Sequence, residues 1–266
     1  MVNIPAIVIS MKGEDKRRDM MDNHLKERGF TAEYFDAVDG RQMDVLSHPD
    51  YLKSKRRAAH GRDLKPGELG CMLSHRAAYQ YILDQGYEHA LLLEDDARLV
   101  PETLNVLSAL IEKGISYDII RLLGSPKVMR SKQRMICPLY KDFHLTRMAT
   151  TPGGAHATLI SKAGAKKLVK ETRKFAYPID TVLGRCWETG INAYSIKPAI
   201  SVPDEENFTS TIGDARHDKT IKLKGLEKIK FKIGRPLFKI GEALGKRKQF
   251  NATEKSDLEL QNTYKR

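Results

Sequence analysis

The sequence of 266 residues is poor in cysteine and contains no long apolar run. Its three cysteines, Cys71, Cys137 and Cys186, are odd in number and have no CxxC spacing, which indicates reduced thiols and gives no sign of a zinc site. No stretch of about 18 uncharged apolar residues is present, so we expect no transmembrane helix. The first residues also lack the basic, apolar and small-residue order of a signal peptide. These absences predict a cytoplasmic protein with one main domain.

Acidic residues are scarce toward the end of the chain. The whole sequence carries a net charge of +12, and residues 216–248 hold twelve basic and three acidic residues, a net charge of +9. Within residues 219–248, lysines alternate with isoleucine and leucine, which predicts one or two basic amphipathic helices interrupted around Gly234 to Pro236. We therefore interpret residues 216–266 as a basic amphipathic C-terminal extension of a main domain that spans residues 1–215.

This extension allows two interpretations. A helix on the anionic inner-membrane surface would gain about 1 kcal/mol from each basic residue near the lipids, and the protein would then be peripheral on that membrane. Alternatively, the helix packs on the domain through its isoleucine and leucine stripe. A nucleic-acid-binding module is less favoured, because only Phe231 and Phe238 interleave with the lysines of this stretch. We therefore expect no nucleic-acid partner.

Residues 1–215 alternate short apolar runs with helix-forming segments. Strands are predicted within residues 4–10, 31–40, 89–96, 117–124 and 151–161. Helices are predicted within residues 11–29, 65–85, after Pro101, and within 161–174 and 178–190. An irregular surface excursion is expected at residues 41–65, and a loop or flap at 125–152. The alternation predicts an α/β fold with a central, mainly parallel sheet, whose ligand sites lie at the carboxyl ends of the strands.

Three acids, Glu94, Asp95 and Asp96, follow directly after the apolar run of residues 90–93. Such a run is typical of a central strand, so the acids are expected at its carboxyl end. Adjacent carboxylates repel one another, and a divalent cation between them would relieve the repulsion. Because side chains alternate along a strand, Glu94 and Asp96 are expected on one side and Asp95 on the other. Glu94 and Asp96 are therefore candidate ligands of Mn²⁺ or Mg²⁺, although solvated carboxylates fit the same pattern.

Six segments together resemble glycosyltransferase family 25, the lipopolysaccharide-biosynthesis type. They occur in the family's order, with roughly its spacing, and span most of residues 4–183. The segments are IVISMKGEDKRR (7–18), FDAVDG (35–40), GELGCMLSH (67–75), ALLLEDD (90–96), GGAHATLISKAGAKKL (153–168) and PIDTVL (178–183). A modest departure is Ala155, which stands where a threonine is common in the family. Residues 216–266 lie outside the resemblance.

The resemblance implies a GT-A-like, Rossmann-type nucleotide-sugar fold and an inverting glycosyltransferase. In many members of the family, galactose passes from UDP-galactose to a growing lipooligosaccharide or lipopolysaccharide. We therefore expect a UDP-sugar donor and a saccharide acceptor of this kind. The family's acidic motif matches the segment from Glu94 to Asp96. A metal-dependent nucleotide-diphosphate hydrolase that uses the same acids is the alternative.

Catalysis by inversion needs a base that is distinct from the metal ligands and takes the proton of the acceptor hydroxyl. Asp180 is the candidate base because its PID segment matches a family motif, with a helix cap as the alternative interpretation. Asp95, expected on the opposite face or toward the sugar, is the second candidate catalytic residue. His156 is a candidate third metal ligand or diphosphate contact, or else a structural histidine.

Five further residues are candidates for binding the nucleotide-sugar donor. They are Ser10 at the end of the first predicted strand, Arg17 and Arg18 for the phosphates, Asp39 for uracil or ribose, and His75 in the GELGCMLSH segment. A solvated helix face is the alternative for the two arginines. An ordinary Asp-Gly turn is the alternative for Asp39.

Overall fold

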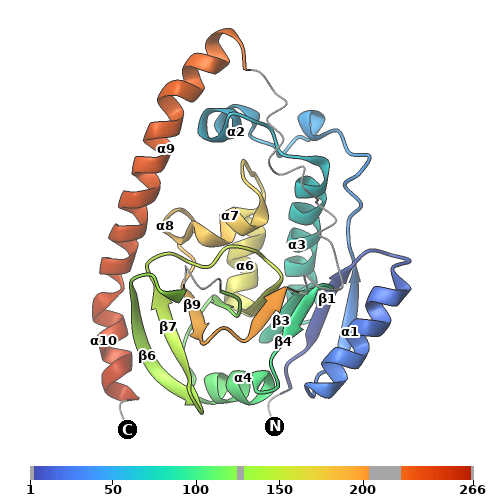
Figure 1. Ribbon diagram of the computed structural model, residues 1–266, viewed down its shortest axis with the longest axis vertical. Coiled ribbons are helices and arrows are strands. Elements are labelled where there is room, and N and C mark those ends of the chain that lie inside the picture. Colours follow the sequence, from blue (N-terminus) through green and yellow to red (C-terminus); the bar gives the residue numbers. More distant parts are fainter. Residues whose placement is uncertain (1–2, 125–128, 204–222, 265–266) are drawn as a thin grey trace.

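An eight-stranded sheet lies at the centre of the protein. The computed structural model describes residues 3–124, 129–203 and 223–264 (Figure 1). The strand order is β2-β1-β3-β8-β5-β9-β7-β6. The strands are β1 (Ala6–Ser10), β2 (Ala32–Asp36), β3 (His89–Glu94), β5 (Ile119–Arg121), β6 (Gln133–Tyr140), β7 (Phe143–Met148), β8 (Ala157–Ser161) and β9 (Ala193–Lys197). Two short strands, β4 (Ala97–Leu99) and β10 (Ser201–Pro203), form a separate antiparallel pair.

Six of the eight strands run in the same direction. β1 is parallel to both β2 and β3, and β5 is parallel to β9. β8 runs the opposite way between β3 and β5, and β7 runs the opposite way between β9 and β6. The predicted α/β fold with a mainly parallel central sheet is therefore confirmed, with one antiparallel strand inserted beside β3.

Helices cover both faces of this sheet. They are α1 (Asp15–Glu27), α2 (Lys53–His60), α3 (Pro66–Asp84), α4 (Thr103–Glu112), α6 (Lys162–Glu171), α7 (Ile179–Gly184), α8 (Cys186–Thr189), α9 (Gly225–Ala252) and α10 (Glu254–Thr263). Ile7 and Leu92 pack with α3, α6 and α7 on one face, whereas Val8, Leu91 and Leu93 pack with α1 and α4 on the other. The strands thus fill two cores, because neighbouring strand residues point to opposite faces.

Two segments are more regular than the sequence predicts. Residues 41–65 contain the turn Val45–Ser47 and helix α2 in place of an irregular excursion. The segment expected as a loop or flap contains the β6–β7 hairpin, while residues 125–128 lie outside the described residues. Pro138 argues against a strand, so the sequence pattern did not predict this hairpin. This proline is tolerated because β6 is an edge strand and its register with β7 shifts next to Pro138.

Helix α9 runs through Pro236 without interruption, so the predicted break around Gly234 to Pro236 is wrong. Tertiary contacts hold the helix at this point, because Arg235 donates a 2.8 Å hydrogen bond to the carbonyl oxygen of Ala59 in α2. The boundary between residues 215 and 216 lies outside the described residues and stays a prediction. Within the part of the chain that the structure describes, no helix is long and apolar enough to cross a membrane.

Two glycines bring the loop after β2 against helix α3. A Cβ atom on Gly70 would lie 2.7 Å from the backbone nitrogen of Gly40 and 2.7 Å from the carbonyl oxygen of Val38. A Cβ atom on Gly40 would lie 2.1 Å from the carbonyl oxygen of Pro66. The backbone of Val38 also donates a 2.8 Å hydrogen bond to Ser74. This close approach fixes α3 relative to the end of β2.

We expect Gly70→Ala to destabilise the protein by about 1–3 kcal/mol, because its methyl group would push backbone against backbone. Gly241→Ala is the matched control, since Gly241 is also inside a helix and its added Cβ would meet nothing within 4 Å. This control should be neutral or stabilising by up to about 1 kcal/mol. Urea denaturation measures both variants, and equal stabilities would contradict the assigned role of Gly70.

Candidate active site

The acidic triplet lies where β3 ends. Glu94 is the last residue of the strand, and Asp95 and Asp96 form the turn that leads to β4. Glu94 contacts His75 on α3, whereas Asp95 contacts Ser10 at the end of β1 and Arg17 on α1. These contacts lie on opposite faces of the sheet, as the alternation of strand side chains requires.

Glu94 is held by helix α3. Its Oε1 atom lies 3.0 Å from His75 Nε2 and 3.8 Å from Cys71 Sγ. Burial opposes ionisation of Glu94, but the hydrogen bond and the electrostatic effect of His75 outweigh it and lower the pKa of Glu94. These contacts therefore favour an ionised Glu94.

His75 itself is only 1% exposed, and its Nδ1 atom lies 3.3 Å from the hydroxyl oxygen of Tyr79. Both ring nitrogens therefore have protein partners. The predicted contact of His75 with the donor is revised for this reason. His75 is thus held between Glu94 and Tyr79, where it orients Glu94.

Each carboxylate oxygen of Asp95 has a side-chain partner. Ser10 donates a 2.9 Å hydrogen bond to Oδ2 of Asp95, and Arg17 forms an ion pair with Oδ1. Burial raises the pKa of Asp95, although both contacts favour its charged form. The structure thus brings three of the predicted site residues together, but it uses both carboxylate oxygens of Asp95 to do so.

Asp96 has a buried oxygen without a hydrogen-bond partner. Among the described residues nothing donates to its Oδ1 atom, and the same holds for His156 Nε2. Burial, together with the charges of Glu94 and Asp95, raises the pKa of Asp96 to about 6. Burial also lowers the pKa of His156 to about 4. His156 lies beside the triplet, because its carbonyl oxygen accepts a 2.9 Å hydrogen bond from the backbone of Glu94.

The donor atoms around the triplet are of types that a hard cation accepts. Buried polar atoms without partners are rare in proteins, so Asp96 Oδ1 and His156 Nε2 are candidate positions for a ligand. A carboxylate oxygen of Asp96, the ionised Glu94 and the neutral imidazole of His156 are ligand types that Mn²⁺ accepts. Cys71, His75 and Glu94 also place three ligand atoms within 4.8 Å of one another. Burial raises the pKa of Cys71 well above its ordinary value, so this protonated thiol does not suit a hard cation.

Asp180 and the triplet act electrostatically on one side chain, that of Cys71. The negative charges of Glu94, Asp180 and Asp96 all act on the Cys71 thiol. Asp180 occupies the first turn of α7, where its Oδ1 atom accepts a 2.5 Å hydrogen bond from the backbone of Thr181. The N-cap of this helix is Pro178, so Asp180 is not the cap itself. The predicted catalytic acid and the predicted metal ligands Glu94 and Asp96 therefore influence one common thiol, and their roles stay predictions.

Residues 3–183 match a family described as "Glycosyltransferase family 25 (LPS biosynthesis protein)", which is well over half of the chain. The chain belongs to glycosyltransferase family 25. The acidic triplet, His75, His156 and Asp180 all lie within the matched residues, whereas α9 and α10 follow them. The site described above is thus the site of a family 25 domain.

Two curated relatives show how similar the sequence of this family 25 chain is to those of known proteins. It is 28% identical over 223 residues to the probable inactive glycosyltransferase 25 family member 3 of Rattus norvegicus, and 27% identical over 188 residues to procollagen galactosyltransferase 1 of Danio rerio. These matches cover 74% and 67% of this chain, but only 38% and 30% of the relatives. The chain therefore spans about a third of the length of these relatives.

One solved structure can be compared with this family 25 chain. It is a glycosyltransferase involved in the glycosylation of the major capsid of PBCV-1. The two chains are 12% identical with a TM-score of 0.30, and the match covers 64% of this chain and 66% of that chain.

Sequence reasoning missed Arg121, which is fully buried in β5. It donates a 2.8 Å hydrogen bond to Thr158, and further bonds to the carbonyl oxygens of Pro152 and Gly154. Burial lowers its pKa, against the charges of Asp180 and Glu94 among others. Arg121 therefore fixes the loop before His156, and its positive charge acts on Asp180 and Glu94. The available signal was an arginine inside the apolar run of residues 119–123.

The side chains of Arg18 and Asp39, two predicted donor-binding residues, pair with residues other than the triplet. Arg18 donates a 2.6 Å hydrogen bond to Asp36 and stacks over the ring of Tyr34, with its centre 4.9 Å away. Asp39 is exposed, and the hydrogen bonds from Arg41 lower the pKa of Asp39 to about 2. Arg18 thus joins α1 to the end of β2, and Asp39 belongs to a local turn.

The raised pKa of Asp96 predicts a pH-dependent stability. Between about pH 4 and pH 6 the folded protein holds a proton on Asp96 that the unfolded chain has lost, so this group makes stability fall as the pH rises. The penalty is complete above about pH 6. Asp96→Asn should therefore stabilise the metal-free protein at pH 7.5, by on the order of 2 kcal/mol, and much less at pH 4.

Urea denaturation in the presence of a chelator measures this difference at both pH values. Asp142→Asn, at an exposed turn between β6 and β7, is the control and should change stability little at either pH. If Asp96→Asn changes stability equally at pH 4 and pH 7.5, the assigned environment of Asp96 is wrong.

Proposed function

We propose that this chain is a metal-assisted, inverting glycosyltransferase that moves a hexose from a nucleotide sugar to a saccharide. The observation that carries this proposal is a pair of buried atoms without partners, Asp96 Oδ1 and His156 Nε2, beside a Glu94 that is held ionised. They lie at the carboxyl end of the central strand β3, where open α/β sheets bind their ligands. Membership of family 25 supplies the class of reaction.

The proposed donor is UDP-galactose, and the proposed acceptor is a lipooligosaccharide or lipopolysaccharide. The donor sugar is supported by the name of the zebrafish relative, a procollagen galactosyltransferase. The acceptor is supported by the family description, which refers to LPS biosynthesis. Another relative is named as probably inactive, so activity of this chain rests on the proposed roles of its own acidic residues.

Glu94, Asp96 and His156 would hold Mn²⁺ or Mg²⁺. When bound, this ion would offset the negative charge of the departing nucleotide diphosphate. His75 keeps Glu94 oriented, and Arg121 keeps the loop that carries His156 in place. Ser10 and Arg17 fix Asp95 on the opposite side of β3, next to the end of β1 where the nucleotide would lie.

Asp180 is the better candidate for the base that removes the proton of the acceptor hydroxyl. Inversion requires the attacking hydroxyl to approach from the side opposite the leaving group, so the base must be separate from the groups around the diphosphate. Asp180 meets this requirement because it stands on α7, separate from the residues that would hold the ion. Asp95 suits a positioning role instead, since Ser10 and Arg17 occupy its oxygens.

Glu94→Gln and Asp96→Asn should each lower kcat by about 100-fold or more, because each removes a charge that holds the ion. The measurement is release of UDP and formation of product from a panel of UDP-sugars, with Mn²⁺ or Mg²⁺ and lipooligosaccharide fragments. Asp142→Asn serves as the control and should keep full activity. Full activity of both site variants would refute the metal assignment.

The same assay distinguishes the transferase from a nucleotide-diphosphate hydrolase. A transferase releases UDP at a substantial rate only when the saccharide acceptor is present, whereas a nucleotide-diphosphate hydrolase cleaves the phosphoanhydride bond of the donor without acceptor and forms UMP and a sugar phosphate. The stereochemistry of the product, read by NMR, tests inversion directly.

Asp180→Asn should lower kcat by about 10²- to 10⁴-fold and leave the KM for the UDP-sugar nearly unchanged, as expected for a general base. Asp95→Asn should instead raise the KM for the donor, because it releases Ser10 and Arg17 from their shared partner. The two variants are compared by steady-state kinetics at saturating acceptor. The reverse pattern would assign the base to Asp95.

A further inference from the structure

Helix α9 has one face that packs on the domain. It lies along the outer side of the domain against α2 and α8 (Figure 1). A Cβ atom on Gly234 would lie 2.8 Å from the carbonyl oxygen of Ala58, and one on Gly245 would lie 2.3 Å from the Trp187 ring. The ring of Phe238 lies 5.0 Å from that of His60. Glycines and aromatic rings, not isoleucine and leucine, therefore make this contact.

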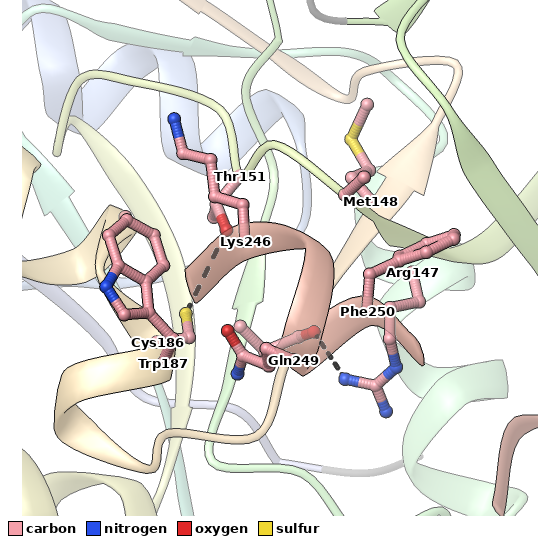
Figure 2. Close-up of a pocket in the computed structure, with 11 residues that line it drawn as sticks. Arg147, Met148, Thr151, Cys186, Trp187, Lys246, Gln249 and Phe250 are labelled. Atoms are coloured by element: carbon pink, nitrogen blue, oxygen red, sulfur yellow. Dashed lines mark hydrogen bonds between the residues drawn. The ribbon is translucent and has the colours of Figure 1, made fainter. Parts of the chain in front are cut away.

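Both ends of α9 are fixed. Near its start, Glu227 forms an ion pair with Arg57 of α2. Near its end, Lys246, Gln249 and Phe250 line one pocket together with Thr151 and Cys186 (Figure 2). The helix that follows carries Asp257, which is fully buried and forms ion pairs with Arg134 and Arg147 of the β6–β7 hairpin. The opposite face of α9 is therefore presented in one orientation.

That opposite face is a stripe of exposed aliphatic side chains. Successive members are three or four residues apart, so they share one side of the helix. All six are between 54% and 74% exposed. The stripe, which we call the outer stripe, consists of Leu226, Ile229, Ile233, Leu237, Ile240 and Leu244. The interpretation that this stripe packs on the domain is therefore wrong.

Positive charge flanks the outer stripe. At 100° per residue, Lys230 and Lys248 fall along one edge of it, and Arg247 falls along the other edge. The acids Glu227 and Glu242 point away from the stripe, and each is paired with a basic residue. The exposed face thus combines large apolar side chains with cationic margins.

We propose that the outer stripe docks α9 flat on an anionic lipid bilayer. Apolar side chains of a surface helix enter the boundary between headgroups and acyl chains, while lysines at its margins contact anionic headgroups. A second copy of this chain fits less well, because a symmetric contact through the stripe would bring cationic margins together. The proposal concerns this face alone and does not depend on the reaction that the domain catalyses.

Flotation of the full-length protein with lipid vesicles tests this proposal. We expect binding to vesicles of phosphatidylglycerol and phosphatidylcholine, and at least tenfold weaker binding to phosphatidylcholine alone. The double variant Ile233→Gln/Leu237→Gln should lose at least tenfold in binding to the anionic vesicles. Lys230→Glu/Lys248→Glu should also weaken binding, and its loss should grow as the salt concentration falls.

Leu46→Gln/Leu52→Gln is the matched control, because these two leucines are also exposed but lie outside α9. It should bind like the unmodified chain. Thermal unfolding checks that all variants are folded, which is expected since every substituted side chain is exposed. Unchanged vesicle binding of the folded Ile233→Gln/Leu237→Gln variant would overturn the proposal. A dimer in analytical ultracentrifugation that this variant abolishes, without vesicle binding by the unmodified chain, would assign the stripe to a second copy.

Discussion

Repulsion among three consecutive carboxylates is the constraint around which the site is built. The fold resolves it unequally, because the end of β3 lets neighbouring side chains leave on opposite faces. Glu94 meets a histidine from α3, and Asp95 meets a serine and an arginine from β1 and α1. Asp96 is left with a buried oxygen and a raised pKa. A bound cation would offset the remaining electrostatic cost of an ionised Asp96.

Contacts between two sequence motifs position the residues that support the acidic triplet. The loop after β2 touches α3 at Gly40 and Gly70, and Ser74 accepts a backbone hydrogen bond from the same loop. His75 follows Ser74 directly, so the position of α3 also sets where its imidazole meets Glu94. The FDAVDG and GELGCMLSH segments therefore act together, although neither contains an atom that would contact the ligand in the proposed mechanism.

The sequence predicted those parts of the fold that local patterns specify. Strand β3, helix α3 and the acids at the strand end followed from an apolar run, a Pro-Gly start and the rule for parallel sheets. Other features depend on partners distant in sequence. Pro138 is tolerated only because β6 is an edge strand, and Pro236 lies in a helix that α2 supports. The role of His75 required knowing that Glu94 lies 3.0 Å away.

The reversed direction of β8 determines how the site is assembled. In the antiparallel ladder Leu93 lies opposite Ala157, so the chain delivers His156 to the triplet just before the strand begins. Arg121 donates hydrogen bonds to two carbonyl oxygens of the segment leading to His156. Its length could change without disturbing a single ladder of the sheet, yet every change would move the imidazole relative to Glu94. Ligand geometry in this architecture can therefore be altered by insertions and deletions in one short segment that lies outside the ladders of the sheet.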